Sequence, residues 1–278
     1  MTPTAICVLG PGRSGTSLTA AILDAIGVYL GTEEELVPAG KGNPKGNWEH
    51  RRIMLLNERL LRAQREDDEA PPHLPPGWES SASLESEREE ARTLIAESFG
   101  GQRLWGWKDP KCSLTLPFWQ QLVPRMRYAI CVRNPLDVVA SAKERRALGG
   151  QRAFFAWFRH MARALVNTSG QPRVLVPYEA YFSNLDGMVA NLAHLAGRTP
   201  PGEVARRKLA ELADEQLWHH RASLDDLLRD ARVPADVKAL YVTVQILSTT
   251  EPTNDEGDSS AHLLADSFAK RLLDERGA

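Results

Sequence analysis

Short apolar runs alternate with longer amphipathic segments along the first two thirds of the chain. The runs TAICVL at 4–9, RYAICV at 127–132 and RVLVPY at 173–178 are almost continuously apolar. Such runs are typical of strands that are buried on both sides of a parallel sheet. A further strand is expected to end at Lys108, in the segment GWKDP. The alternation of strands and helices therefore predicts an α/β fold, a parallel sheet flanked by helices.

The helices are predicted from apolar residues that recur with helical spacing. From Leu18 onward, apolar positions follow at i+3, i+4, i+7 and i+8, and Gly27 provides a stop signal. Further helices are expected at about 51–65, at 84–99, from the NPLD segment at 134–137, and at 152–167. Beyond residue 184 the chain is expected to be helical to its end, with breaks near Pro200, His219 and the polar stretch 251–260.

Two polar segments are predicted as loops. Residues 31–50 are dense in Gly, Pro and Asn, and residues 66–83 combine an acidic run with several prolines. We expect the second segment to be a surface excursion that covers a site as a lid and helps to shape a pocket.

The composition narrows the class of protein. A formal net charge of −2 in 278 residues leaves no basic excess for general binding of nucleic acid or of anionic membranes. No window approaches 18 continuous apolar residues, and the first residues lack a secretory pattern, so a cytoplasmic protein without a membrane span is expected. Cys7, Cys112 and Cys131 have no metal-ligand spacing and are predicted to be buried free thiols. The sequence leaves the oligomeric state open.

The segment GPGRSGTS, between the first strand and the first helix, is the first candidate site. Phosphate-binding loops read G-x-x-x-x-G-K-[ST], and their backbone N–H groups surround the phosphates. Gly10 and Gly15 keep this spacing, but Thr16 stands in the lysine position and Arg13 supplies a cation inside the loop. A strand-to-helix junction still offers free N–H groups and a helix dipole to an anion. The segment therefore predicts an anion site in a P-loop-type sheet.

A second candidate anion site follows the strand at 127–132. Arg133 comes directly after this strand, and the next helix contains Ser141 and Arg145. Because Ser141 and Arg145 are four residues apart, both project from one helix face and can hold a phosphate together.

These two segments resemble a known family. GPGRSGTS resembles the 5′-phosphosulfate loop of sulfotransferases that use 3′-phosphoadenosine 5′-phosphosulfate (PAPS), and RNPLDVVAS resembles their 3′-phosphate motif. The arginine-containing loop is similar to that of the Golgi tyrosylprotein and carbohydrate sulfotransferases and of bacterial homologues. These relatives also carry segments like Lys108–Asp109–Pro110 and Asn43 to Glu49. The resemblance covers residues 4–185, so we expect a single domain over 1–278, with a cofactor-binding core at 1–185 and a helical C-terminal part at 186–278.

The resemblance implies PAPS as cofactor, with 3′,5′-adenosine bisphosphate (PAP) as product and no metal. A transferring sulfuryl group carries less charge than a terminal phosphoryl group and ordinarily needs no Mg²⁺, so the missing lysine is dispensable. Catalysis is then expected from in-line positioning and from cations at the leaving oxygen. The resemblance assigns the 5′ end of the cofactor to Gly12, Arg13, Ser14, Gly15, Thr16 and Ser17, and the 3′-phosphate to Arg133, Ser141, Arg145 and Tyr178.

Sulfation of a hydroxyl also requires a base and a cation at the leaving group. Lys108 is expected at the carboxyl edge of the sheet, where open α/β folds bind ligands, and is predicted to donate to the bridging oxygen. Asp109 is expected to orient Lys108 or the acceptor, and Lys111 to lie on the surface. The candidate bases are Glu33, Glu34 and Glu35, just after the first helix where the tyrosylprotein relatives carry their base, and Glu49. The register counted from Arg13 favours Glu34, but the insertion up to Asn47 could bring Glu49 to that place. His50, expected to be exposed, and His219 with His220, in a helical stretch, fit less well.

The predicted activity is transfer of the sulfuryl group from PAPS to a hydroxyl of a carbohydrate or glycosylated small molecule. Tryptophans 48, 78, 105 and 107 flank the expected cleft and could stack on acceptor rings, although tryptophans near strands are usually core residues. The alternatives are a P-loop nucleoside or nucleotide kinase, which needs a substitute cation and Mg²⁺, and a nucleotide-binding module whose catalytic groups have decayed. Metal-dependent binding of ATP would favour the kinase.

Overall fold

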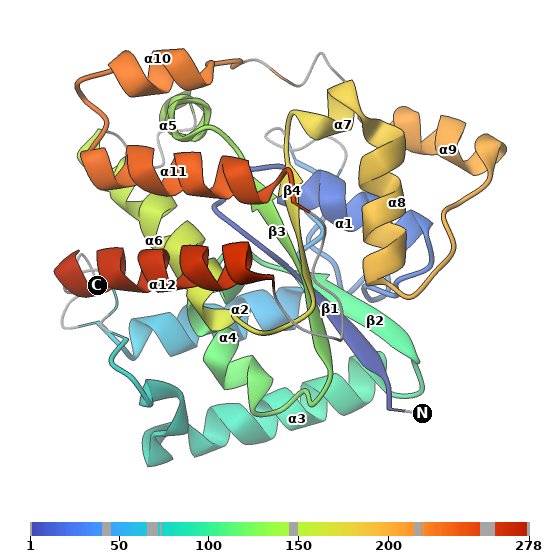
Figure 1. Ribbon diagram of the computed structural model, residues 1–278. Helices are drawn as coiled ribbons and strands as arrows, with labels where there is room; N and C mark the ends of the chain where they lie inside the picture. The colour runs from blue at the N-terminus through green and yellow to red at the C-terminus, as the bar shows by residue number, and fades with distance from the viewer. Residues whose placement is uncertain are drawn as a thin grey trace.

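The computed structural model describes residues 2–40, 46–65, 72, 74–144, 150–213, 218, 220–250 and 259–276, without the side chains of Glu144 and Lys208. Its centre is a four-stranded sheet of order β2-β1-β3-β4 in which every pair is parallel (Figure 1). The strands are β1 (Thr4–Leu9), β2 (Leu104–Lys108), β3 (Met126–Val132) and β4 (Arg173–Pro177). The predicted α/β fold with a parallel sheet is confirmed.

Helices cover both faces of the sheet (Figure 1). On one face lie α1 (Thr16–Ala25), α7 (Ala180–Ser183), α8 (Leu185–Leu195) and α9 (Glu203–Ala210). On the other lie α2 (Arg51–Arg62), α3 (Glu85–Phe99), α4 (Cys112–Gln120), α5 (Pro135–Glu144), α6 (Gln151–Asn167), α11 (Ala235–Leu247) and α12 (Ser260–Arg276). The short α10 (Leu224–Arg229) precedes α11.

The strands are apolar on both sides because each side faces a separate core. In β1, Cys7 and Leu9 belong to the cluster under α2 to α6, whereas Ile6 and Val8 belong to the cluster under α1 and α8. Side chains of a strand alternate between the two faces, so a strand between two helical layers is apolar over most of its length, and polar residues such as Arg127 and Arg173 lie near its ends. The three cysteines are buried free thiols, as expected.

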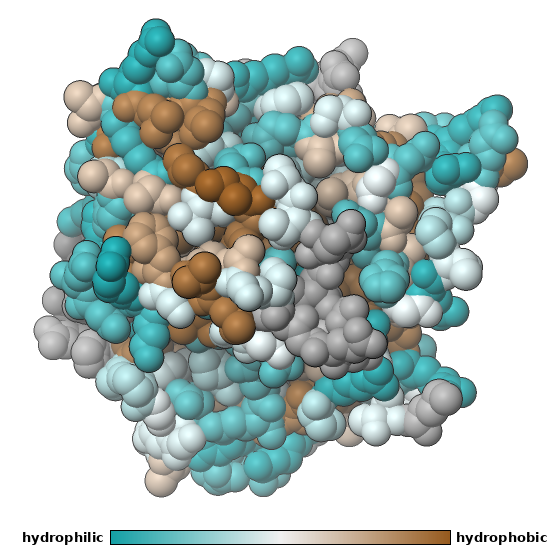
Figure 2. Space-filling view, in the orientation of Figure 1, coloured by the Kyte–Doolittle hydropathy of each residue, from teal (hydrophilic) through white to brown (hydrophobic). Residues whose placement is uncertain are grey.

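The helical C-terminal part is tied to the sheet by a buried ion pair. Helices α11 and α12 pack against α6, and Arg173 Nη2 at the start of β4 lies 2.8 Å from Asp266 Oδ2 on α12, with both side chains buried. The outer face of this part carries exposed apolar side chains (Figure 2), among them Leu224, Leu228, Ile246, Leu263 and Leu264. None of the helices in the described ranges is both long and apolar enough to cross a membrane.

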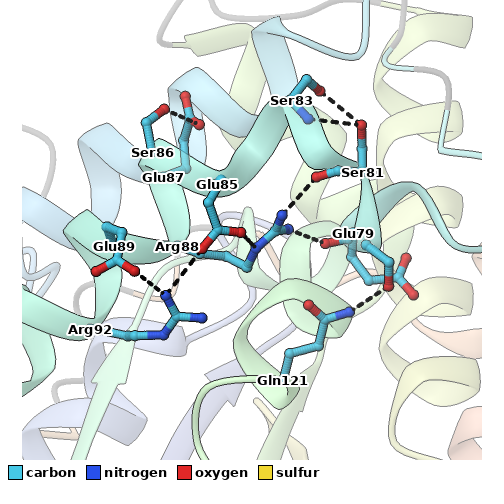
Figure 3. A network of polar contacts seen from close by, with 11 residues as sticks. Glu79, Ser81, Ser83, Glu85, Ser86, Glu87, Arg88, Glu89, Arg92 and Gln121 are labelled. Carbon is cyan, nitrogen blue, oxygen red and sulfur yellow. Dashed lines mark hydrogen bonds and ion pairs between the residues drawn. The ribbon is translucent and has the colours of Figure 1, made fainter.

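The excursion at 66–83 differs from the expectation. Residues 66–71 and 73 lie outside the described residues, but its second half forms the 3₁₀ helices η1 (Trp78–Ser80) and η2 (Ala82–Leu84), and Trp78 and Leu84 are buried in the main core. Arg88 holds these helices, because its guanidinium donates to the carbonyls of Glu79 and Ser81 and pairs with Glu85 (Figure 3).

This half of the excursion also lies at the end of α4 that is farther from Lys108. Ser80 Oγ accepts a hydrogen bond from Gln121 at the C-terminal end of α4, whereas the N-terminal end of α4 follows Lys108. Most residues of this half are exposed, as predicted, but the expectation that it packs no element was wrong, because Trp78 anchors a short helix in the core.

Candidate functional site

The glycine-rich loop, Gly10 to Ser17, turns from the end of β1 into α1. Gly10 and Gly15 have φ angles of 118° and 87°, and a Cβ at Gly10 would lie 2.4 Å from the carbonyl oxygen of Cys131. A Cβ at Gly15 would lie 2.6 Å from the ring of Tyr178. Arg13 also has a positive φ, 70°, which is uncommon for a residue with a side chain. The loop is therefore held in a conformation that only this pattern of glycines allows.

The end of this loop has the polar groups that an anion requires. Helix α1 begins without a side-chain cap, so its first N–H groups are available. Ser14 is 1% exposed, and its hydroxyl has no hydrogen-bond partner among the described residues. Ser17 Oγ donates to the carbonyl of Asn47 at 3.1 Å, which ties the loop to the segment that leads to Glu49. A buried hydroxyl at a helix N-terminus fits a phosphate or sulfate group.

The two anion segments predicted from the sequence meet in the structure. Arg13 Nε donates to Ser141 Oγ at 3.0 Å, across 128 positions of the chain. Arg133 Nη1 donates to the carbonyl of Arg13 at 3.1 Å. The guanidinium of Arg133 lies over the ring of Tyr178, 4.3 Å from its centre. These residues form one basic cluster, while Arg145 lies outside the described residues.

A segment that the sequence analysis did not assign to the site covers the side of Arg133. Arg133 Nη2 donates to the carbonyl of His220 at 3.2 Å, and Asn134 Nδ2 donates to the carbonyl of Ala222 at 2.9 Å. Asp137 Oδ1 accepts from the Ala222 N–H at 2.9 Å, and its other oxygen, Oδ2, lies 3.6 Å from Arg133 Nε. His219 lies outside the described residues, and His220 is in an irregular segment rather than a helix. The capping box of Ser223 with Asp226 was a local signal that a helix begins only after this segment.

The rings of Phe182 and Trp218 pack against Tyr178. Trp218 stacks on Phe182 with ring centres 4.8 Å apart and meets Tyr178 edge-on at 5.9 Å. Burial raises the pKa of the Tyr178 hydroxyl, although the charges of Arg133 and Arg13 oppose this. The ring is thus held neutral and fixed, where it can orient the guanidinium of Arg133.

The carboxyl end of β2 places Lys108 beside Glu49. Lys108 is 2% exposed, and its ammonium forms an ion pair with Glu49 Oε1. The other carboxylate oxygen, Oε2, is buried and has no hydrogen-bond partner among the described residues. Burial lowers the pKa of Lys108, and the negative charges of Glu49 and Asp109 oppose this effect. The pair brings an acid and a base together at the edge where the loop lies.

The backbone of Glu49 is fixed by the segment that carries the other candidate base. Val37 N–H donates to the Glu49 carbonyl at 2.8 Å, and Leu36 forms an isolated antiparallel bridge with His50. Glu34 is exposed on this segment. His50 is buried, contrary to the expected exposure, and lies 3.4 Å from Glu35. The side chain of His50 packs against Phe99, which explains why a polar residue after a loop becomes a core residue.

The remaining candidates have structural partners. Asp109 is buried and accepts hydrogen bonds from Asn57 and from the Lys111 backbone, while Lys111 pairs with Glu58 at 3.2 Å in a partly exposed position. Three of the tryptophans considered for an acceptor site, Trp78, Trp105 and Trp107, are buried in the core. Trp48 is partly exposed beside Glu49. Over the described ranges, no group of three or more His, Cys, Asp or Glu side chains is arranged to hold a metal ion.

Comparison with known proteins agrees with the motifs. A model of the Sulfotransferase family matches residues 3–200. No curated protein matches the chain. The fold is similar to the sulfotransferase domain from the Synechococcus PCC 7002 olefin synthase, with 17% identity over 98% of this chain and 95% of that chain and a TM-score of 0.47.

Two further solved structures are similar to a comparable degree. The sulfotransferase domain from the curacin biosynthetic pathway has 15% identity over 98% of each chain and a TM-score of 0.47. Retinol dehydratase, solved with androsterone and the inactive cofactor PAP, has 15% identity over 98% of this chain and 81% of that chain, with a TM-score of 0.43. Because the family model spans well over half of the sequence and includes both anion segments, this chain belongs to the sulfotransferase family.

Proposed function

We propose that this sulfotransferase moves the sulfuryl group of PAPS to a hydroxyl of a carbohydrate or other small-molecule acceptor. The observation that carries the proposal is the contact of Lys108 with Glu49 at the sheet edge that also holds the glycine-rich loop. A cytoplasmic site of action belongs to the proposal, and the three free cysteines support it because they suit a reducing compartment.

The basic cluster of Arg13, Arg133 and Ser141 fits the two charged ends of PAPS. Ser14, Arg13 and the first N–H groups of α1 would bind the 5′ phosphosulfate, since the buried Ser14 hydroxyl lacks a partner among the described residues. Arg133, Ser141 and Tyr178 would bind the 3′-phosphate, and we assign Arg145 to the same group from the sequence motif. The hydrogen bond between Arg13 and Ser141 supports a single ligand, because it joins the two anion segments.

Lys108 and Glu49 would carry out the two proton-related tasks of the transfer. Glu49 Oε2 takes the proton of the acceptor hydroxyl while the acceptor oxygen forms its bond to sulfur. The bond from sulfur to the 5′-phosphate oxygen breaks in the same step, and Lys108 stabilises the charge on that oxygen. Lys108 keeps its protons through the step and donates a hydrogen bond to the leaving oxygen. Products are the sulfate ester, PAP and the proton on Glu49.

Glu49 is the preferred base because of its surroundings. Its Oε2 is buried without a partner among the described residues, whereas Glu34 is exposed. The acceptor would then approach past Trp48, which adjoins Glu49 and is partly exposed. Such a ring can pack against the apolar face of a sugar or an aromatic acceptor.

Titration calorimetry tests the cofactor assignment. We expect PAP to bind without a metal and more tightly than ATP, with or without Mg²⁺. Release of PAP from PAPS is then measured with a panel of phenols, primary alcohols and glycosides. Tighter binding of ATP that depends on Mg²⁺ would support a kinase instead, and PAP binding without turnover of any acceptor would support a binding module.

A further inference from the structure

Asn57, on α2, lies at the centre of a saturated polar cluster. Its side chain is fully buried. Nδ2 donates to Asp109 Oδ2 at 2.9 Å and to Cys112 Sγ at 3.2 Å. Oδ1 accepts from Thr115 Oγ1 at 2.7 Å and from Trp119 Nε1 at 2.8 Å. A carboxamide offers two donors and two acceptor positions, so all four are used.

Asp109 depends on this cluster. It is 2% exposed, and its second oxygen, Oδ1, accepts from the Lys111 N–H at 3.0 Å. A buried carboxylate is costly unless its oxygens accept hydrogen bonds. The Asn57 amide and the first turn of α4 both bind the carboxylate of Asp109. Through it they fix the turn that follows Lys108.

The same helix begins close to Glu49. Helix α2 begins at Arg51, two residues after Glu49, and Asn57 lies within this helix. A helix transmits position along its axis because its backbone is internally hydrogen bonded. The bond from Asn57 to Asp109 thus connects the element that follows Glu49 to the turn that follows Lys108.

We propose that Asn57 is a positioning residue, which sets the separation of Glu49 and Lys108 by joining α2 to the Lys108 turn through Asp109. This inference rests on the proposed function, in which these two side chains carry the reaction. The hydrogen bonds of Asn57 go to neither the glycine-rich loop nor Arg133, so its effect is on catalytic geometry and not on cofactor affinity.

The test compares N57D with T115V, a matched control. N57D sets a second carboxylate against Asp109, whereas T115V removes one donor to Asn57 Oδ1 and leaves the bond to Asp109 in place. We expect T115V to lower the melting temperature and to keep kcat. We expect N57D to lower kcat on the order of 100-fold, the effect of a misplacement of about 1 Å. PAP affinity from calorimetry stays the same in both variants.

The double variant N57D/D109N exchanges the amide and the carboxylate. The amide introduced at position 109 can donate to the carboxylate introduced at position 57 and still accept from the Lys111 N–H. That carboxylate in turn still accepts from Thr115 and Trp119. We expect this exchange to restore kcat most of the way to the parent value. If Asn57 had only a structural role, kcat would fall in each variant in proportion to the fall in its melting temperature.

Crystal structures of N57D and T115V test the position of Lys108 and Glu49 directly and do not depend on measurable enzyme activity. The contact of Lys108 with Glu49 is expected to break in N57D and to persist in T115V. If N57D does not fold, N57S takes its place, because serine is too short to reach Asp109. An intact Lys108–Glu49 contact with an unchanged kcat in N57D or N57S overturns the proposal. If the parent protein sulfates none of the acceptors, the proposed function fails, and the crystal structures still decide the role of Asn57.

Discussion

Replacement of Glu49 by glutamine separates the two candidate bases. The glutamine of E49Q keeps an oxygen that accepts from Lys108, and its amide nitrogen occupies the position of Glu49 Oε2, which has no partner among the described residues. The amide cannot take a proton from the acceptor. Loss of a general base lowers the rate by about 100- to 10,000-fold, which corresponds to about 3–5 kcal/mol of activation free energy.

The matched control is E34Q, because Glu34 is exposed on the neighbouring segment. E49Q weakens a charge-assisted bond to Lys108 and is expected to cost about 1 kcal/mol of stability, so both variants can be assayed well below their melting temperatures. PAP release from PAPS is measured for each variant with the acceptor that the parent uses, and PAP affinity by calorimetry. A loss of kcat in E34Q together with normal turnover in E49Q would refute the reasoning from burial.

Three further outcomes follow from the structure. K108M should lower kcat on the order of 100- to 1,000-fold because the leaving oxygen loses its cation, while K111M leaves turnover and PAP affinity unchanged. D266A leaves the fully buried Arg173 guanidinium without its carboxylate, and urea unfolding should show a loss of about 3 kcal/mol. Burial lowers the pKa of His50 below its ordinary value of 6.5, so the unfolded chain binds the proton first as pH falls, and stability is lost below pH 6.5. In H50Q, urea unfolding just below that pH should show a smaller loss; an equal loss would contradict the assignment to His50.

The strands were predictable because their environment is uniform. The run 4–9 coincides with β1 and the run 127–132 with most of β3, since a strand covered on both faces is apolar at most positions. The segment around Trp78 was not predictable in the same way. Its prolines and acidic residues indicate a surface loop, and only the tertiary packing shows that Trp78 and Leu84 have a place in the core.

The site was predictable where its residues are close in sequence. The spacing of Gly10 and Gly15 encodes the loop, and the spacing after Arg133 encodes the helix that carries Ser141, because both depend on local backbone geometry. The choice between Glu34 and Glu49 depends on how residues 31–50 fold back. A bridge between residues 36 and 50 brings the described parts of this segment together, and no local sequence signal predicts it.

The sequence by itself determined the layered parallel sheet, the glycine-rich turn and the family, since these follow from periodicity and from backbone conformations that only certain residues adopt. Tertiary structure alone decided that Arg13 reaches Ser141, that Glu49 meets Lys108, and that Asn57 holds Asp109. Each of these contacts joins residues that are far apart in the chain. Their partners are selected by the packing of helices on the sheet, which local propensity does not encode.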